Sequence, residues 1–288
     1  NDSSVLRPFL ESLLKRENRD GRILYSVIEL LLSMNGIDWS GLVDRQEFDS
    51  LKSVKELETF FSEVSDPVAI NLSNIKRWGE MVTIPAGKFI YQDEVDEEDH
   101  IFLKEFSIMK FPVTNALYKE FDPNHILRFP KYSYLDDHPV IGINFYEALV
   151  CSLWLGRRLP IEKEWEKSAR GVDGRDYPWG EAMGYQNDYA NTCDFVIGRT
   201  SSVTEFEQGI SPFGCFDMAG NVWEWCVQLY STRHVTQRVA RGGSWLNYMV
   251  HSKCTYRNTF DPDERYPASG FRCVSLPLTL VDDIEDDD

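Results

Sequence analysis

Apolar residues recur at helical spacing through the first quarter of the chain. In residues 5–14 and 22–34 they return every three or four positions, and residues 54–64 repeat the pattern. An Asn-Gly pair at 35–36 is a typical stop for the second of these segments. The pattern predicts a helical extension over residues 1–75, with a structural or docking role.

The pattern changes at Trp78, after which short β-like runs alternate with turns. Two helices are predicted in this part, over residues 144–155 and 161–170. Pro160 is expected in the first turn of the second helix, where proline is tolerated. The remainder, residues 178–274, is dense in Gly, Trp and Asn, which predicts long ordered loops. The fold class is therefore predicted to be α+β and loop-rich.

Composition narrows the classes of function. The chain has 288 residues, of which 42% are hydrophobic and 13% aromatic, enough for a substantial core. The net charge of −17 argues against a nucleic-acid partner, because binding phosphates needs a basic face. No apolar stretch reaches the roughly 18–20 residues of a membrane span. The acidic residues at the end predict a tail over 277–288.

The six cysteines are scattered and form neither a CxxC pair nor a zinc-binding spacing. Their even number permits disulfides, while scattering through a large domain fits buried free thiols. We expect free thiols. The cysteines are Cys151, Cys193, Cys215, Cys226, Cys254 and Cys273.

Three motifs dominate the second half of the chain: DMAGNVWEW at 217–225, RGGSW at 241–245 and GFRCV at 270–274. Glu224 stands between two tryptophans, and a carboxylate among large apolar rings needs a cation or hydrogen-bond donors to offset its desolvation. Gly220 and Asn221 tolerate the positive φ of a tight turn.

These motifs, in this order, resemble those of the formylglycine-generating enzyme and sulfatase-modifying factor domain family. The likeness spans most of the chain and implies a domain over residues 76–276 with a variant of the C-type lectin fold. Further motifs in family order are MVTIPAGKF (81–89), FPVTN (111–115), HPV (138–140), GRRLPIEKEWE (156–166) and YPWG (177–180).

The resemblance also implies structural calcium. Glu224, with the carbonyls of Gly220 and Val222, is similar to one family site, and a second would lie near Asn191 and Thr192. Bound calcium would stabilise loops without doing chemistry. The alternative is that Glu224 pairs with an arginine or accepts backbone N–H bonds.

Family members that oxidise a substrate cysteine bind copper through two cysteines just after Gly-Gly-Ser. Here residues 245–253 contain no cysteine, and the nearest is Cys254. Because Cu(I) favours thiolate ligands, no copper and no formylglycine generation are expected. Two alternatives stay open: an enzyme of altered chemistry in the same cleft, and a regulatory module that acts through the helical segment.

The block from Trp245 to Phe271 has a layout similar to the variable proteins of diversity-generating retroelements. Those use this fold to display a surface varied at asparagine-type codons. Thirteen residues are reachable from an Asn codon by changing its adenines: Leu246, Asn247, Tyr248, Val250, His251, Asn258, Thr259, Phe260, Asp261, Tyr266, Pro267, Ala268 and Ser269. The alternative is an ordinary family member whose loops have drifted.

We therefore predict a non-catalytic protein that binds a protein ligand, favoured to be a monomer. A variable protein would lie at the cell surface or in the periplasm; otherwise the cytoplasm is expected. Aromatic anchors and small polar residues are typical of binding loops. The predicted contact residues are Trp245, Leu246, Asn247, Tyr248, Val250, His251, Asn258, Phe260, Asp261, Tyr266 and Ser269.

Overall fold

The computed structural model describes residues 72–92, 100–122, 125–181, 188–232 and 235–275. The helices predicted within residues 1–71 and the acidic tail at 277–288 lie outside these ranges. Within the ranges, no helix combines the length and apolar character needed to cross a membrane.

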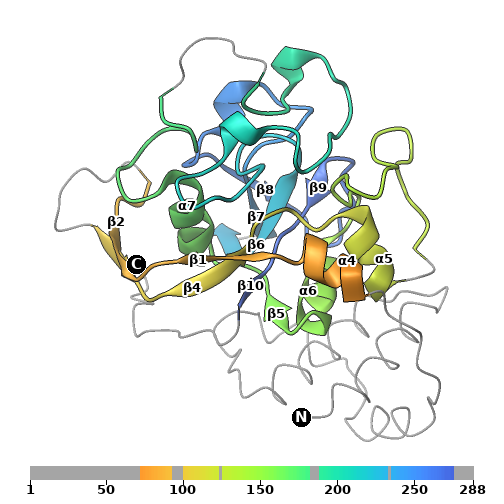
Figure 1. Cartoon of the computed structure of the whole chain (residues 1–288), viewed down its shortest axis with the longest axis horizontal. Coiled ribbons are helices and arrows are strands. Elements are labelled where there is room, and N and C mark those ends of the chain that lie inside the picture. The colour runs from red at the N-terminus through yellow and green to blue at the C-terminus, as the bar shows by residue number, and fades with distance from the viewer. Residues whose placement is uncertain (1–71, 93–99, 123–124, 182–187, 233–234, 276–288) are drawn as a thin grey trace, which may run out of the picture.

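One four-stranded sheet joins both ends of the described chain (Figure 1). Its last strand lies between strands from the first half, since Val274 pairs with Ile108 on one side and with Arg158 on the other. The domain is therefore closed by pairing between distant segments. The strands in spatial order are β1 (Met81–Ile84), β4 (Phe106–Met109), β10 (Val274–Ser275) and β5 (Arg157–Arg158).

A second four-stranded sheet carries the C-terminal motifs. The long hairpin of β6 and β7 forms its centre, and β9 runs parallel to β6 through the pairs Trp223–Ser269 and Glu224–Gly270. The short strands β2 (Gly87–Phe89) and β3 (Ile101–Leu103) form a separate antiparallel pair. The second sheet in spatial order is β8 (Arg257–Phe260), β7 (Val235–Arg241), β6 (Trp223–Thr232) and β9 (Ser269–Gly270).

Both helices predicted in this domain are present, as α6 (Phe145–Trp154) and α7 (Glu162–Arg170). Pro160 was expected in the first turn of the second helix, and this expectation is wrong. Ile161 is the N-cap of α7, so the proline precedes the helix. The backbone N–H of Ile161 donates to the Glu164 carboxylate at 3.0 Å, which closes the first turn.

Two further helices pack together on one side of the first sheet: α4 (Leu72–Trp78) and α5 (Asn115–Phe121). Thr114 caps α5 by accepting the N–H of Leu117 at 3.2 Å. The predicted boundary between residues 75 and 76 falls inside α4, and the division into domains stays a prediction.

Tryptophans fill the space between the second sheet and the helices. Trp165, Trp223 and Trp225 are all at least 99% buried. Trp225 packs edge-on against Phe145 of α6, and its indole N–H donates to the Ile143 carbonyl at 2.8 Å. The WEW and EKEW motifs are thus core elements. The loops after β7 are built on this rigid base.

Candidate ligand-binding face

The Gly-Gly turn after β7 positions the predicted binding loop. Gly243 has φ of 74°, and a Cβ there would lie 2.1 Å from the Ser252 hydroxyl oxygen. The turn therefore needs glycine for conformation and for space. This close approach brings the short helix η5 (Met249–Ser252) back against the turn.

Asn247 holds the loop from beneath. Its side-chain oxygen accepts hydrogen bonds from the Trp223 indole N–H at 2.9 Å and from the Ser244 hydroxyl at 2.5 Å. Its backbone N–H donates to the Ser244 carbonyl at 2.9 Å. Asn247 is one of the predicted contact residues, but its side-chain oxygen is not available to a ligand, because it accepts hydrogen bonds within the domain.

The most exposed side chains of this loop alternate with half-buried ones. Leu246 is 39% exposed, Tyr248 60% and Val250 53%. His251 is half-buried, with its ring edge-on to Tyr256 at 5.0 Å between centroids. These residues therefore lie where a ligand can reach them.

Three predicted contact residues are buried, and their expected exposure is wrong. Trp245 is 5% exposed and lies against Tyr132, with ring centroids 4.8 Å apart. Phe260 packs edge-on to Trp225 at 5.7 Å. Ser269, 1% exposed, donates its hydroxyl to the Tyr266 carbonyl at 3.0 Å. Large rings and short polar side chains look alike in a loop sequence whether they face the core or solvent.

The remaining predicted contacts lie farther along the block. Asn258 sits in β8 opposite Ala240 and is half-buried. Tyr266 is half-buried because its ring stacks on Phe260 at 5.0 Å. Asp261 is exposed, and its carboxylate accepts the N–H of Asp263 at 3.2 Å. The structure places these three beside the second sheet rather than in the loop of η5.

A second loop, which sequence reasoning did not include, is tied to the first. It carries the short helix η3 (Cys193–Phe195), and the N–H of Cys193 donates to the Asn247 carbonyl at 2.9 Å. The N–H of Met249 donates to the Asp194 carboxylate at 2.7 Å. Val196 follows η3 and is 85% exposed. The signal available in the sequence was the uncharged run Phe-Val-Ile-Gly at 195–198.

Glu224 does not fit the calcium role that the family resemblance implied. It is fully buried, and its two carboxylate oxygens accept from Arg272 at 2.6 Å and 2.7 Å. The Trp165 indole N–H donates to one of the same oxygens at 2.7 Å. The Arg272 guanidinium thus already neutralises the charge of Glu224. Glu224 therefore needs no calcium ion to balance its charge, and its grouping with the Gly220 and Val222 carbonyls does not fit a calcium site.

The second predicted calcium position lies among buried oxygen atoms. Thr192 donates its hydroxyl to Asp194 at 3.2 Å, and the side-chain oxygen of Asn191 is buried without a hydrogen-bond partner. One carboxylate oxygen of Asp217 is likewise unpaired, while the other accepts from Asn221 at 2.8 Å. Unpaired acceptors suit a hard cation, so calcium near Asn191 and Thr192 stays a prediction. Within the described ranges, no three His, Cys, Asp or Glu side chains converge as metal ligands.

Burial controls the protonation of Asp217. Desolvation raises the pKa of its carboxyl to about 7, although the hydrogen bond from Asn221 and the charge of Arg272 act in the opposite direction. This carboxyl therefore titrates near neutrality. Its hydrogen-bond partner Asn221 accepts the backbone N–H of Trp245 at 3.1 Å, which links the carboxyl to the start of the loop.

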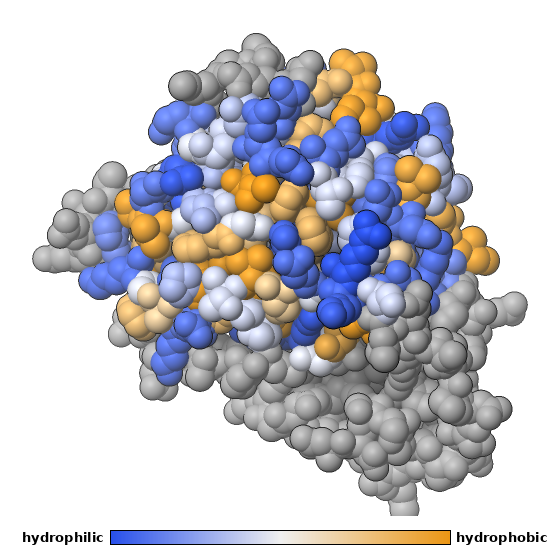
Figure 2. Space-filling view, viewed as in Figure 1, coloured by the Kyte–Doolittle hydropathy of each residue, from blue (hydrophilic) through white to orange (hydrophobic). Residues whose placement is uncertain are grey.

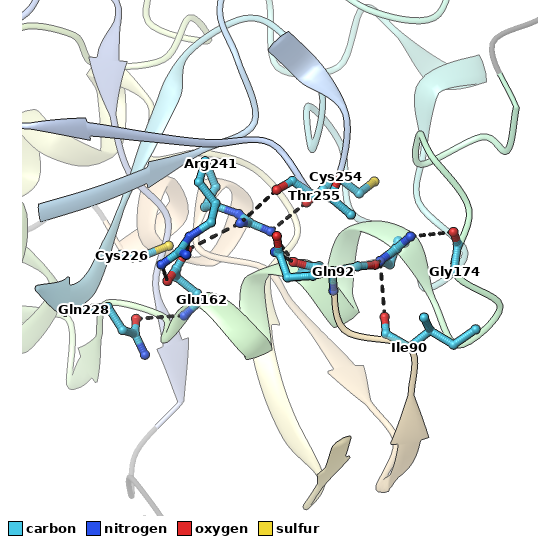
Figure 3. A network of polar contacts seen from close by, with 12 residues as sticks. Ile90, Gln92, Glu162, Gly174, Cys226, Gln228, Arg241, Cys254 and Thr255 are labelled. Carbon is cyan, nitrogen blue, oxygen red and sulfur yellow. Dashed lines mark hydrogen bonds and ion pairs between the residues drawn. The ribbon is translucent and has the colours of Figure 1, made fainter. Parts of the chain in front are cut away.

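A buried ionic network anchors α7 to the second sheet below the face (Figure 3). Arg241, the first residue of the RGGSW motif, pairs with Glu162 at 3.3 Å and also with Glu166. Arg257 of β8 pairs with Glu162 at 2.7 Å, and Glu166 pairs with Arg170 at 3.0 Å. Arg241 also donates to the Cys254 carbonyl at 2.7 Å, which fixes the chain just after η5. The network is structural and orients the loop.

All six cysteines are free thiols, and all but Cys193 are buried. Desolvation raises the pKa of Cys215 to about 11 and that of Cys273 to about 12. Burial likewise raises the pKa of Cys254, the cysteine nearest the Gly-Gly-Ser turn. A thiol that stays protonated is a poor nucleophile and a poor metal ligand.

This arrangement of two four-stranded sheets, flanking helices and long ordered loops defines a C-type lectin-like fold of the formylglycine-generating enzyme type. The family model of the sulfatase-modifying factor enzyme 1-like domain matches residues 70–276. The chain therefore belongs to that family.

Relatives with this domain carry different names. The serine/threonine-protein kinase pkn1 of Chlamydia caviae is 31% identical over 242 residues, which cover 68% of this chain and 38% of the relative. The inactive C-alpha-formylglycine-generating enzyme 2 of Bos taurus is 32% identical over 48% of this chain and 50% of its own length. The formylglycine-generating enzyme of Mus musculus is 29% identical over 51% and 46%. The aligned region thus spans half or less of each of these three relatives.

Two solved structures share the fold. The Treponema denticola variable protein 1 superposes with a TM-score of 0.60 at 20% identity, covering 68% of this chain and 95% of its own. PvdO from Pseudomonas aeruginosa gives 0.56 at 22% identity, covering 67% and 93%. At these identities the likeness establishes the fold alone.

Proposed function

We propose that the protein is a non-catalytic ligand-binding protein that presents the exposed part of its C-terminal loop to a protein ligand. The observation that carries the proposal is Tyr248, which is 60% exposed on a loop held from beneath by Asn247 and the Gly-Gly-Ser turn. A fixed, exposed tyrosine offers a large contact area at a small cost in conformational entropy. Leu246 and Val250 extend the apolar surface beside it.

The non-catalytic part of the proposal rests on the thiols. Residues 242–252 contain no cysteine, and the pKa of the nearby Cys254 is raised by burial. A copper centre that oxidises a substrate thiol needs thiolate ligands, which this loop does not supply. The family includes a formylglycine-generating enzyme and a relative named as inactive, and the loop favours the second kind.

The proposal is tested with peptides selected from a random library displayed on phage against the full chain. We expect Tyr248→Ala to weaken binding of the selected peptides at least tenfold, because exposed aromatic anchors dominate interface energies. Phe102→Ala, which removes a 56% exposed ring from β3, is the matched control. If Tyr248→Ala binds all the peptides like wild type, this loop is not the binding surface.

A narrower form of the proposal is that the sequence of the block 245–271 varies between isolates. The name of the Treponema denticola variable protein 1 suggests such variation for that protein. Sequencing codons 245–271 in several isolates tests this. We expect substitutions at exposed positions such as Tyr248 and Val250, with the buried Phe260, Ala268 and Ser269 constant. If the block is identical in all isolates, the diversification hypothesis is wrong, and ligand binding by a fixed surface remains the proposal.

Two alternative functions are separated from this one by simple experiments. A regulatory role of residues 1–75, which lie mostly outside the described residues, predicts that deleting them abolishes function while peptide binding persists. An enzyme of altered chemistry would turn over a substrate in the same cleft. Turnover that Tyr248→Ala lowers would place the catalytic site at this loop, whereas turnover that Tyr248→Ala leaves unchanged would place it elsewhere.

A further inference from the structure

Two exposed cations lie beside the loop of η5, each over a tyrosine ring. The Nζ atom of Lys131 is 5.4 Å from the centroid of the Tyr132 ring, and the guanidinium carbon of Arg199 is 5.9 Å from the centroid of the Tyr134 ring. Within the described ranges, neither cation forms an ion pair with a carboxylate. A ring attracts a cation without cancelling its charge. Both charges therefore stay available to a ligand.

Hydrogen bonds place the two cations on neighbouring segments of backbone. Thr200, which follows Arg199, donates its N–H and its hydroxyl to the Tyr132 carbonyl at 3.0 Å and 2.7 Å. Tyr132 in turn follows Lys131, and its ring lies against Trp245 of the loop of η5, with centroids 4.8 Å apart. The backbone that carries both cations is thus fixed next to the proposed binding loop before any ligand binds.

The carboxylates of the two segments that carry these cations are engaged or half-buried. Asp136 is exposed but pairs with Lys119 at 2.8 Å. Asp194 is half-buried, and its carboxylate accepts the N–H of Met249 at 2.7 Å. Asp137 is half-buried too, and among the described residues it forms no ion pair. The two exposed charges of these segments that lack an ion pair are therefore both positive.

Other groups near the two cations do not reverse this local charge. His138 is buried, and desolvation lowers the pKa of its ring, so the imidazole is mostly neutral at pH 7. Lys253, just after η5, pairs with Asp176 at 2.8 Å. The net charge of the whole chain does not decide the charge here. Six of the seven residues at 93–99 and six of the seven at 282–288 are acidic, and both runs lie outside the described residues.

An exposed apolar stretch precedes Arg199. Val196 is 85% exposed and Ile197 37%. Figure 2 shows apolar side chains gathered at the top of the view, over the loop that carries η3, with hydrophilic residues beside them. An apolar centre bordered by charged groups is typical of a protein interface. The anion recognised here should therefore accompany apolar contacts, as a side chain of a protein does.

We propose that Lys131 and Arg199 recognise acidic side chains of the protein ligand. The inference rests on the proposed function and adds the chemistry of the ligand, which presents carboxylates next to the apolar groups that meet Tyr248. Arg199 offers a planar fork of N–H donors that fits a carboxylate, and Lys131 offers a point charge. The tyrosine beneath each cation limits its motion, which reduces the entropy lost on binding.

The test uses peptides selected from the phage library against the full chain, with dissociation constants from fluorescence anisotropy. We expect the peptides to be enriched in Asp and Glu next to aromatic or aliphatic residues. Lys131→Gln and Arg199→Gln should each weaken binding about two- to fivefold, as one exposed ion pair does, with unchanged stability in urea. Asp137→Asn should strengthen binding, because it removes an opposing charge. Added salt should weaken binding of wild type more than that of Arg199→Gln.

Lys163→Gln is the matched control and should bind like wild type. Lys163 also lies over a tyrosine ring, that of Tyr91 at 5.9 Å, but it belongs to α7. Replacing an acidic residue of a peptide by its amide should lower the affinity and remove the sensitivity to Arg199→Gln, which a purely structural role of Arg199 would not produce.

If Lys131→Gln and Arg199→Gln both bind like wild type while Tyr248→Ala weakens binding, the acidic recognition is wrong and the proposed function stands. If Tyr248→Ala also binds like wild type, both are wrong. Selected peptides without an excess of acidic residues would likewise overturn the inference. Inorganic phosphate that binds the wild-type chain but not Arg199→Gln, with no effect of either variant on the peptides, would assign the cations to a free anion and overturn it too.

Discussion

The Glu224 carboxylate forms a two-point ion pair with the Arg272 guanidinium in the interior of the domain, with N–O distances of 2.6 Å and 2.7 Å. Both residues are completely buried. The pair joins β6 to the segment between β9 and β10, and so connects the two sheets. The WEW and GFR motifs are explained by this contact, without a metal ion.

Glu224→Gln should therefore destabilise the domain by about 3–5 kcal/mol, because it leaves the Arg272 charge buried without a counter-charge. Urea unfolding measures the loss, and the value should be the same with calcium and with a chelator. Asp136→Asn, which breaks an exposed pair with Lys119, is the control and should cost no more than about 0.5–1 kcal/mol. A loss seen only in the presence of calcium would restore Glu224 as a ligand.

The burial of Trp245 separates it from the exposed Tyr248. Trp245→Ala should cost about 3–5 kcal/mol of unfolding free energy, since it opens a cavity against Tyr132. Tyr248→Ala should change stability by less than about 0.5 kcal/mol, as exposed substitutions usually do. Thermal or urea unfolding of the two variants gives the comparison. Equal effects would show that the loop packs differently.

Asp217 predicts a pH dependence of stability. Burial raises the pKa of its carboxyl to about 7, whereas in the unfolded chain this carboxyl would have the ordinary aspartate pKa of 3.8. The stabilising effect of the proton is complete below pH 3.8 and is lost as pH rises to about 7, because over that window only the unfolded carboxyl ionises. Asp217→Asn should remove this slope, which corresponds to roughly 4 kcal/mol at most.

The measurement is urea unfolding between pH 4 and pH 8 in a chelator, so that a bound cation cannot supply the counter-charge. An unchanged slope in Asp217→Asn would assign the pH dependence to other groups. If calcium binds near Asn191, added calcium should stabilise the wild-type chain above pH 7 and the Asp217→Asn variant less.

The thiols should differ in reactivity. Alkylation of the native protein at pH 7.5, followed by peptide mass mapping, should modify Cys193 first, because it alone of the six is not buried. Cys215 and Cys273, whose pKa values are raised to about 11 and about 12, should react only after unfolding. Cys193→Ser gives the background. Fast labelling of Cys254 in the folded protein would contradict the buried, protonated thiol described above.

Local pattern determined much of the domain. The predicted helices over 144–155 and 161–170 are the helices Phe145–Trp154 and Glu162–Arg170, because a 3.6-residue apolar period reports one buried face within a short segment. The order of the motifs indicated the family, and the family match over residues 70–276 confirms it. Composition alone gave the acidic net charge of the chain.

The tertiary structure decided which loop residues face solvent. Trp245 and Tyr248 are three positions apart in an uncharged loop, yet one is 5% exposed and the other 60%. A loop has no period that marks an inner face, so its exposure depends on what packs against it, here Tyr132 from another segment. The pairing of Glu224 with Arg272, 48 residues away, likewise depends on chain reversals that no local pattern encodes.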